Sequence, residues 1–556
     1  MKKLFALLVA LVLAASCLAL AGAEEAEGLK QDVLVLFTSD VHCGVDQNFG
    51  YAGLQQVRDS AVAAGQHVVL VDDGDAIQGE SIGIMTRGEA DIELMNALGY
   101  DAAAPGNHEF DYGMERFLEL AELAEFPYIS CNFRKNGELV FAPYVIKEFD
   151  GVKIAFVGAT TPETLVSSTP RYFQDEQGRY IYDFTQGGDG SEFYSAVQRA
   201  VNDARAEGAS YVFLVAHLGN EASCQPFTYA DVIEHTSGID AVLDGHSHDT
   251  DKVVMKNEAG VDVIRQACGT KMAGIGWLRI SAEDGSVDTG LYTWNNDVPA
   301  PELLGIDNEL GRLVEEKTSD IYALLSKVVA TANVELTIDD PEAVDASGTP
   351  VRIAREAETN LGDLCADAAR WDSGAQIGFV NGGSIRHGLP KGEITLKDVM
   401  GVYPFGNRVV MVEATGAQIL DALEWAARVV PEENGAFLHC SGLTYEIHTY
   451  VKHSCTSDPN GVFAGVLGDY RVQNVMVDGE PLDLDATYTV AGQAYILVDH
   501  GDGQAAFDGA KLVWESDGLD YLILADYIRD GLGGVIGEGY ENPYGQERIV
   551  AVETAP

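Results

Sequence analysis

The chain has 556 residues, of which 46% are hydrophobic, enough for two or three packed domains rather than a disordered chain. Its 87 acidic and 35 basic residues give a formal charge of −52 at pH 7, which excludes long nucleic acids and anionic membrane surfaces as partners. A small anion can still bind where metals or a few arginines reverse the field locally.

The first predicted element is a signal peptide at residues 1–23. Two lysines precede an apolar run from Leu4 to Leu20, and residues 21–23 are small, as signal cleavage requires. We therefore expect an exported protein, either secreted, periplasmic or at the cell surface. Lipidation at Cys17 is an alternative form of anchoring. No later stretch approaches about 18 consecutive apolar residues, so no other membrane span is expected.

Of the eight cysteines, seven remain once Cys17 is removed with the signal peptide, so at least one is unpaired. Cys440 and Cys455 flank a predicted hairpin and either pair with each other or stay free. No CxxC pair indicates a structural zinc site.

The first half of the chain repeats one pattern, in which an apolar, β-branched run ends and a residue able to bind metal follows. The runs are Val33–Phe37 before Asp40 and His42, His67–Val71 before Asp75, Ala102–Ala104 before Asn107 and His108, Tyr211–Val215 before His217, and Ala241–Leu243 before His246 and His248. Such runs suit strands buried on both faces, with helices at 52–64 and 114–124 between them. Ligands of layered α/β sheets collect at the carboxyl ends of strands, so these residues should meet in one pocket.

Seven of these residues carry side chains that bind divalent ions: Asp40, His42, Asp75, Asn107, His217, His246 and His248. They are too many for one tetrahedral ion and suit two ions that share a carboxylate, for which Asp75 is the natural choice. Extended backbone places residues i and i+2 on the same side of the chain. Asp40 and His42, and likewise His246 and His248, can therefore face one metal region. The mixed donor set favours Mn, Zn, Fe or Co. The alternative for any single histidine is a capped or solvent-facing residue.

In the stretch Gly106-Asn107-His108-Glu109, the amide can give an oxygen to a metal while the imidazole faces a substrate. Asp111 follows His108 by three residues and can bond the far ring nitrogen, which fixes the tautomer. The alternative is a helix start with Asn107 as its N-cap and two acids in its first turn.

Residues 299–327 are predicted to be a linker between two domains, and they contain an amphipathic helix from Asn308 to Lys327. Beyond it, Arg355 precedes a predicted helix, and a predicted strand ends at Asn381 in a glycine turn followed by Arg386. Backbone N–H groups and a guanidinium can converge on an oxyanion there, and the alternative is an ordinary turn with a surface arginine.

An aromatic turn follows at residues 403–407, where Phe405 and Asn407 present a ring and an amide. This composition is typical of a platform for a nucleic base, and its alternative is a core turn.

The first-half motifs resemble, in order, those of calcineurin-like metallophosphoesterases: Asp40-Val41-His42, Gly74-Asp75, Gly106-Asn107-His108-Glu109, His217 and Gly245-His246-Ser247-His248. Tyr51-Ala52-Gly53-Leu54 and Thr160-Thr161-Pro162-Glu163-Thr164 narrow the resemblance to the 5′-nucleotidase branch, which includes bacterial UDP-sugar hydrolases. The segments around Arg355, Asn381 and Phe405 resemble the family's C-terminal domain. The resemblance runs from about residue 32 to the end of the chain. It implies a four-layer α/β/β/α metallophosphoesterase domain at 30–298, a linker helix within 299–327 and an α+β substrate-binding domain at 328–556.

The resemblance also implies residue roles. One ion would be held by Asp40, His42, Asp75 and His248, and the other by Asp75, Asn107, His217 and His246. Phosphate would contact Arg355 and Arg386, the nucleoside would contact Asn381, Asn407 and Asp502, and the base would stack on Phe405. The family's second stacking aromatic lies six residues before that Asp. Here Ile496 holds that position and Tyr495 lies one residue earlier, so we expect a one-residue insertion to restore Tyr495 to the role.

The sequence thus predicts a secreted phosphohydrolase that uses two divalent ions to release phosphate from nucleoside 5′-monophosphates, as a monomer or dimer. His108, oriented by Asp111, would stabilise the charge that develops on the leaving oxygen. Two alternatives need the same metals and nucleoside pocket: hydrolysis of UDP-sugars or other nucleotide diphosphates, and of 2′,3′-cyclic nucleotides. A nucleotide- or metal-binding surface protein without turnover is the alternative outside enzymes.

Overall fold

The computed structural model describes residues 28–175, 177–293, 307–344 and 350–555. The predicted signal peptide, Cys17 and the first part of the predicted linker lie outside these ranges. Within them, none of the helices has the length and apolar composition needed to cross a membrane.

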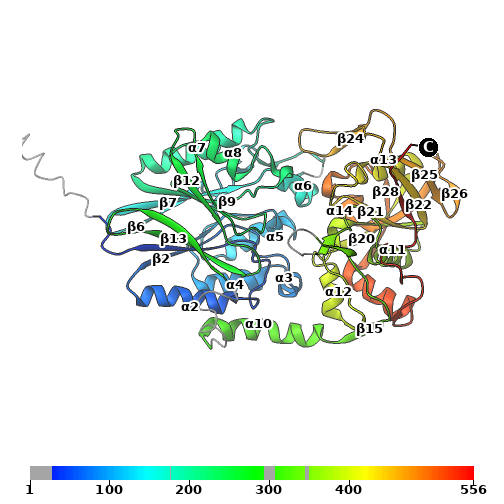
Figure 1. Ribbon diagram of the computed structural model, residues 1–556, viewed down its shortest axis with the longest axis horizontal. Helices are drawn as coiled ribbons and strands as arrows, with labels where there is room; N and C mark the ends of the chain where they lie inside the picture. The colour runs from blue at the N-terminus through cyan, green and yellow to red at the C-terminus, as the bar shows by residue number, and fades with distance from the viewer. Residues whose placement is uncertain (1–27, 176, 294–306, 345–349, 556) are drawn as a thin grey trace, which may run out of the picture.

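Two β-sheets stack face to face in the first domain (Figure 1). The first has the strand order β14 (Val287–Thr293), β13 (Gly274–Ile280), β1 (Val33–Thr38), β2 (His67–Asp72) and β3 (Ala102–Ala103). The second has the order β11 (Lys252–Lys256), β12 (Asp262–Ala267), β10 (Ala241–Asp244), β9 (Ala209–His217), β7 (Val152–Thr160) and β6 (Tyr144–Phe149). The predicted strands β1, β2 and β3 are parallel, and so are β7, β9, β10 and β12.

The central strand β1 is apolar from Val33 to Phe37 because both of its faces are buried. In β1, Val33, Val35 and Phe37 pack against side chains of the second sheet, whereas Leu34 and Leu36 pack against the outer helices. Outside the first sheet lie α2 (Gly50–Ala63), α4 (Glu89–Leu98) and α5 (Met114–Leu123), and outside the second lie α7 (Ser191–Ala206) and α8 (Tyr229–His235). The predicted four-layer α/β/β/α architecture is confirmed.

Short elements complete this domain. They are a small sheet of β5 (Glu138–Leu139), β4 (Phe133–Lys135) and β8 (Tyr182–Phe184), the helices α3 (Ser81–Thr86) and α6 (Thr164–Ser167), and the 3-10 turns η1 (His108–Phe110), η2 (Pro170–Phe173) and η3 (Ala222–Cys224). Most of them border the carboxyl ends of the parallel strands.

The helix α10 (Glu309–Leu325) runs along the outside of the first domain toward β15 (Val328–Ala332) in the second (Figure 1). Its N-cap is Asn308, whose Oδ1 accepts a hydrogen bond from the Gly311 N–H at 2.8 Å. Leu310 and Val314 face α2 and α4 and are buried in the core of the first domain. The N-terminal half of the helix is therefore attached to the first domain, whereas Leu325 at its C-terminal end is buried in a core of the second.

The second domain contains a central mixed sheet with the order β21 (Leu438–Ser441), β18 (Ile377–Asn381), β27 (Thr487–Gln493), β20 (Arg408–Thr415) and β28 (Lys511–Leu519). The smaller sheets are β26 (Glu480–Pro481), β25 (Val472–Val477), β22 (Leu443–His448) and β30 (Ile549–Val552); β19 (Gly392–Thr395), β15 and β29 (Val535–Ile536); β16 (Asp339–Val344) and β17 (Pro350–Arg352); and β23 (Cys455–Ser457) and β24 (Phe463–Val466).

Helices cover both faces of this central sheet, which gives the domain an α+β fold and two apolar cores. They are α11 (Asn360–Ser373), α12 (Leu396–Val402), α13 (Gly416–Ala426), α14 (Ala494–Leu497) and α15 (Asp520–Asp526), with the short turns η4 (Gly382–Ser384), η5 (Gly501–Gly503) and η6 (Tyr527–Gly531). Cys440 and Cys455 are both free, so the disulfide considered from the sequence is not formed. Cys440 is buried in β21, where its thiol donates to the Leu443 carbonyl oxygen at 3.1 Å.

Candidate active site and metal centre

The predicted metal-binding residues lie in turns after the parallel strands, except His217, which is the last residue of β9. Five of them adopt the left-handed region, with φ of 50° at Asp40, 47° at His42, 59° at Asp75, 78° at His246 and 54° at His248. The prediction of extended backbone for Asp40 with His42 and for His246 with His248 is therefore wrong. Non-glycine residues rarely adopt positive φ, and such turns concentrate at functional sites.

Backbone hydrogen bonds between two neighbouring turns hold this conformation. The Asp40 N–H donates to the Gly74 carbonyl oxygen and the His42 N–H to the Asp75 carbonyl oxygen, both at 2.9 Å. Glu109 adds a third connection, because its carboxylate accepts the backbone N–H groups of Asp75 at 2.8 Å and Ala76 at 2.9 Å. Sequence reasoning missed this role of Glu109, since nothing local shows that its carboxylate reaches a turn 34 residues away.

Three side chains form a first group of metal-competent atoms, namely those of Asp40, His42 and His248. The Nε2 atoms of His42 and His248 are 3.1 Å apart, and His248 Nε2 lies 3.5 Å from Asp40 Oδ1. His42 Nδ1 contacts the Gln78 carbonyl oxygen at 2.9 Å, which orients Nε2 toward the group.

Asp75, His217 and His246 form a second group, and the Asn107 amide joins it. His217 Nε2 lies 3.1 Å from Asp75 Oδ2, and Asn107 Oδ1 lies 2.9 Å from His246 Nδ1 and 3.3 Å from His217 Nε2. The same Oδ2 atom of Asp75 lies 4.0 Å from Nε2 of His42 in the first group, so the Asp75 carboxylate lies between the two groups.

Asn107 precedes η1, but its side chain makes no capping hydrogen bond. Its amide oxygen points to the histidines of the second group instead. The helix-cap alternative is therefore wrong for this residue.

The electrostatics of these groups suit cations. Burial lowers the pKa of His246 to about 3 and of His248 to about 4, so both imidazoles are neutral, the form that binds a metal. Burial also raises the pKa of Asp40 to about 7, because its carboxylate is removed from water and lies beside Asp75. His217 differs, because burial lowers its pKa but the charges of Asp75 and Asp40 outweigh burial and raise that pKa. Imidazoles, an amide oxygen and buried carboxylates are the donor set of divalent transition ions, and positive charge here would stabilise the carboxylates.

His108 borders the second group and is held by Asp111. Its Nδ1 lies 2.6 Å from Asp111 Oδ2, and Ser168 Oγ donates to Asp111 Oδ1 at 3.1 Å. Burial lowers the pKa of His108, but the charges of Asp111 and Asp75 outweigh it and raise that pKa to about 9. The ring therefore carries a proton at neutral pH, and its Nε2 is left for a ligand.

The residues predicted to bind substrate come from the second domain and line a cavity of about 1160 Å³ between the domains. This cavity also exposes Asn107, His108 and Asp111 of the first domain. All the predicted substrate residues contribute to its wall: Arg355, Asn381, Arg386, Phe405, Asn407, Tyr495 and Asp502.

Two arginines give this wall a positive charge that is not neutralised. Among the described residues, the buried Nε atoms of Arg355 and Arg386 find no hydrogen-bond partner. Burial, followed by the charges of Arg355 and Arg352, lowers the pKa of Arg386 to about 9. Buried like charges with free donors are unfavourable alone and indicate an anion as their ligand.

The remaining predicted contacts are ordered by hydrogen bonds. Asp502 Oδ2 accepts from Asn381 Nδ2 at 2.8 Å, and its Oδ1 accepts from the Tyr495 hydroxyl at 3.3 Å. Ile496 is buried in the core of the domain, so Tyr495 is the residue that reaches the cavity. The Asn407 amide donates to the buried Asp520 at 3.2 Å.

Sequence reasoning missed four further arginines of the cavity: Arg87, Arg352, Arg408 and Arg428. Arg352 pairs with Glu433 at 2.7 Å, and the Arg428 guanidinium lies 3.8 Å from the centre of the Trp425 ring. Neither belongs to a motif, and only the approach of distant loops places them here.

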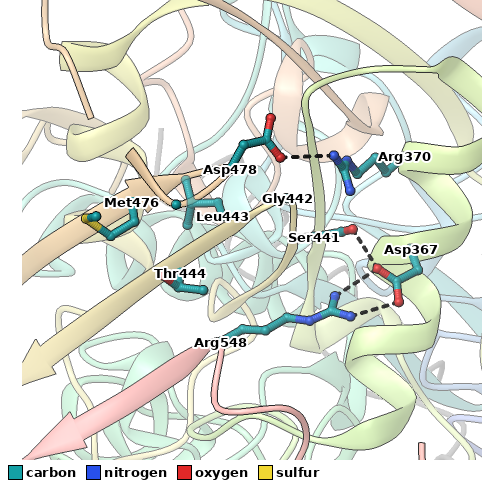
Figure 2. A pocket seen from close by; sticks show the side chains of 10 residues that line it. Asp367, Arg370, Ser441, Gly442, Leu443, Thr444, Met476, Asp478 and Arg548 are labelled. Atoms are coloured by element: carbon teal, nitrogen blue, oxygen red, sulfur yellow. Dashed lines mark hydrogen bonds and ion pairs between the residues drawn. The ribbon is translucent and has the colours of Figure 1, made fainter. Parts of the chain in front are cut away.

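A second cavity, of about 220 Å³, lies on the second domain between α11, β22 and β25 (Figure 2). Its charges neutralise each other, because Arg548 makes two hydrogen bonds of 2.9 Å to Asp367 and Arg370 contacts Asp478 at 3.3 Å. It therefore lacks the unpaired positive charge of the interdomain cavity.

Comparison with known proteins agrees with this geometry. Residues 33–250 match the calcineurin-like phosphoesterase family model, and residues 328–509 match the model of the 5′-nucleotidase C-terminal domain. The chain is 28% identical over 546 residues to the trifunctional nucleotide phosphoesterase protein YfkN of Bacillus subtilis, a match that covers 90% of this chain and 34% of that protein. It is 26% identical over 528 residues to a 5′-nucleotidase of Vibrio parahaemolyticus, covering 89% of this chain and 88% of that one.

A crystal structure of a 5′-nucleotidase precursor from Thermus thermophilus superposes with a TM-score of 0.71 at 26% identity, covering 94% of this chain and 100% of that chain. The two matched domains follow each other in the order found here, and the residues of the metal and arginine sites lie within them. The chain therefore belongs to the 5′-nucleotidase family of phosphoric ester hydrolases, with a calcineurin-like phosphoesterase domain followed by a 5′-nucleotidase C-terminal domain.

Proposed function

We propose that this protein hydrolyses nucleoside 5′-monophosphates with two divalent ions. The observation that carries the proposal is that one cavity is lined by Asn107, whose amide oxygen joins the second metal-competent group, by His108 and by the arginines with unpaired Nε atoms. Asp40, His42, Asp75 and His248 would hold one ion, and Asp75, Asn107, His217 and His246 the other. Bound divalent ions supply Lewis-acid chemistry to phosphoryl oxygens and to water.

The arginines would bind the phosphate from the opposite side of the cavity. Arg355 and Arg386 offer unused N–H donors, and guanidinium forks match phosphate oxygens in geometry and charge. They also reverse the acidic field of the protein at the one place where an anion must enter.

His108 would act on the leaving group. Its protonated ring, held by Asp111 through Nδ1, can stabilise negative charge on the departing nucleoside oxygen and give it a proton from Nε2. Cations bound at Asp75 would weaken the effect of its carboxylate on the pKa of His108. Asp111 would then be the main partner of the protonated ring.

The nucleoside would lie against the second domain. Phe405 and Tyr495 offer aromatic rings, Asn381 and Asn407 offer amides, and Asp502 offers a carboxylate for ribose hydroxyls. We take residues 30–298, 299–327 and 328–556 as the catalytic domain, linker and substrate domain. The predicted cleavage after residue 23 would place the enzyme outside the cytoplasm.

A phosphate-release assay tests the proposal. Purified chain with Mn²⁺, Zn²⁺ or Co²⁺ should release phosphate from AMP, and His108→Ala should be nearly inactive. UDP-glucose, ADP and 2′,3′-cyclic AMP, with their nucleotide products separated by chromatography, distinguish the alternative substrates. Binding of a nucleotide without turnover of any of them would identify a non-catalytic protein.

A further inference from the structure

A third group of metal-competent atoms adjoins the candidate centre and uses the far side of one of its histidines. Glu163, Cys224 and His246 each offer one ligand atom, and these three atoms lie within 4.8 Å of one another. His246 directs Nδ1 to Asn107 and His217, whereas its Nε2 faces Glu163 Oε2 at 3.8 Å. One imidazole therefore stands between two possible ion positions.

The contacts within this group fit an ion better than they fit hydrogen bonds. A distance of 3.8 Å from His246 Nε2 to Glu163 Oε2 is too long for a hydrogen bond. Bonds of about 2.0–2.3 Å in a tetrahedron separate two ligand atoms by roughly 3.3–3.7 Å, close to this spacing. Among the described residues, Glu163 Oε2 is buried without a hydrogen-bond partner. The Cys224 thiol contacts two hydroxyl groups, that of Ser223 at 3.9 Å and that of Thr161.

An ion can reach the group from the interdomain cavity. Glu163 and Ser223 line that cavity, as does Glu221, whose exposed carboxylate precedes Cys224 by three residues. The side chains of Glu163 and His246 remain 18% and 11% exposed, respectively.

The donor set selects soft ions. A thiolate binds Zn²⁺ or Cd²⁺ strongly and Mn²⁺ or Mg²⁺ poorly, so excess Mn²⁺ should leave the group empty. Binding would release the thiol proton of Cys224 to solvent, and the proton on Nε2 of His246 would move to Nδ1 as that atom leaves the centre.

We propose that Glu163, Cys224 and His246 form an inhibitory site for zinc and other thiophilic divalent ions. The inhibition rests on the proposed function, because an ion at Nε2 draws His246 away from the centre that needs its Nδ1. Low zinc would thus support catalysis through the first two groups, and higher zinc would suppress it through the third.

Titration of the Mn²⁺-loaded full chain with Cd²⁺ tests the site by a signal independent of activity. Cadmium bound to a thiolate has a charge-transfer absorption in the ultraviolet, and neither of the other two groups contains sulfur. We expect this band in the wild type, one additional ion per chain, and a parallel loss of phosphate release from AMP. Cys224→Ser should abolish the band and raise the inhibitory Cd²⁺ concentration at least tenfold, with unchanged activity in Mn²⁺.

Cys131→Ser is the matched control, because Cys131 is also buried in the first domain but lies in none of the three groups. It should keep both the band and the inhibition. Glu163→Gln should weaken the band, which checks the site if Cys224→Ser proves poorly folded by circular dichroism. A wild type without the band, or a folded Cys224→Ser that stays equally sensitive, would overturn the site. A Cys224-dependent band in a chain that releases no phosphate would instead refute the proposed function alone.

Discussion

His108 of the first domain faces Phe405 of the second, with ring centroids 5.7 Å apart and ring planes inclined by 23°. The Arg386 guanidinium lies on Phe405 as well, 4.9 Å from the ring centre. The predicted proton donor, phosphate ligand and base platform thus touch each other across the interdomain cavity. A nucleotide can bind between them only if Phe405 moves away from His108 or the domains separate slightly.

The contact between His108 and Asp111 should be required for the chemical step. We expect His108→Ala to lower kcat for AMP by about 100- to 10,000-fold, the usual contribution of a general acid. Asp111→Asn should lower it by about 10- to 100-fold, because the amide cannot stabilise the protonated ring. The double variant should be no slower than His108→Ala, since both changes remove one function. Additive losses in kcat would contradict the pairing, and KM should change little in all three.

Phe405 should contribute binding of the base rather than chemistry. Replacing it with Leu removes the aromatic face but keeps an apolar side chain, and we expect KM for AMP to rise about tenfold, in keeping with roughly 1.4 kcal/mol of stacking. Phe405→Tyr is the matched control and should stay near the wild type. Glycerol 3-phosphate, which has no base, should show no such rise. An equal effect on both substrates would place Phe405 in the chemistry instead.

The position of Asp75 between the two groups predicts how metal content responds to mutation. His248→Ala should leave about one tightly bound ion per chain, and Asp75→Asn should disturb both, because its carboxylate borders each group. Elemental analysis of dialysed protein measures this directly. A chelator should abolish phosphate release and lower the melting temperature, and added Mn²⁺ should restore both. Full metal content in Asp75→Asn would rule out its bridging position.

His439 should make the second domain sensitive to acid. The ring is fully buried, its Nε2–H donates to the Ala354 carbonyl oxygen at 2.9 Å, and burial lowers its pKa from 6.5 to about 4. Because the unfolded chain binds this proton more readily, stability is fully present above pH 6.5 and decreases by roughly 3 kcal/mol as the pH falls to 4.

Urea unfolding at several pH values, monitored by fluorescence, checks this expectation. His439→Gln retains an N–H donor for Ala354 but cannot titrate, so its free energy of unfolding should depend less steeply on pH between 6.5 and 4. Equal slopes in the two proteins would show that another group causes the acid sensitivity.

Local pattern was sufficient to find the strands and the residues after them. The run Val33–Phe37 is apolar at every position, which only a strand buried on both faces requires, and Asp40 and His42 follow it at once. The same reasoning located β2, β3, β9 and β10, because a strand buried on both faces shows as an apolar run of a few neighbouring residues.

The backbone that holds these side chains depended on distant contacts. His246 and His248 join different groups, as the resemblance implied, whereas Asp40 and His42 share one group although their φ values are also positive. Glu109 supports the Asp75 turn from 34 residues away, and Tyr495 rather than Ile496 reaches the cavity because the second is packed in the core.

The sequence by itself therefore determined the family resemblance, the strands and the set of chemically competent side chains. Only the tertiary structure decided the left-handed turns that carry the metal-competent side chains, that Cys440 and Cys455 stay apart, and that His246 presents its second nitrogen to Glu163 and Cys224. The physical reason is that apolar periodicity is a property of a few neighbouring residues. The approach of polar atoms, in contrast, is set by hydrogen bonds between turns that are far apart in the chain.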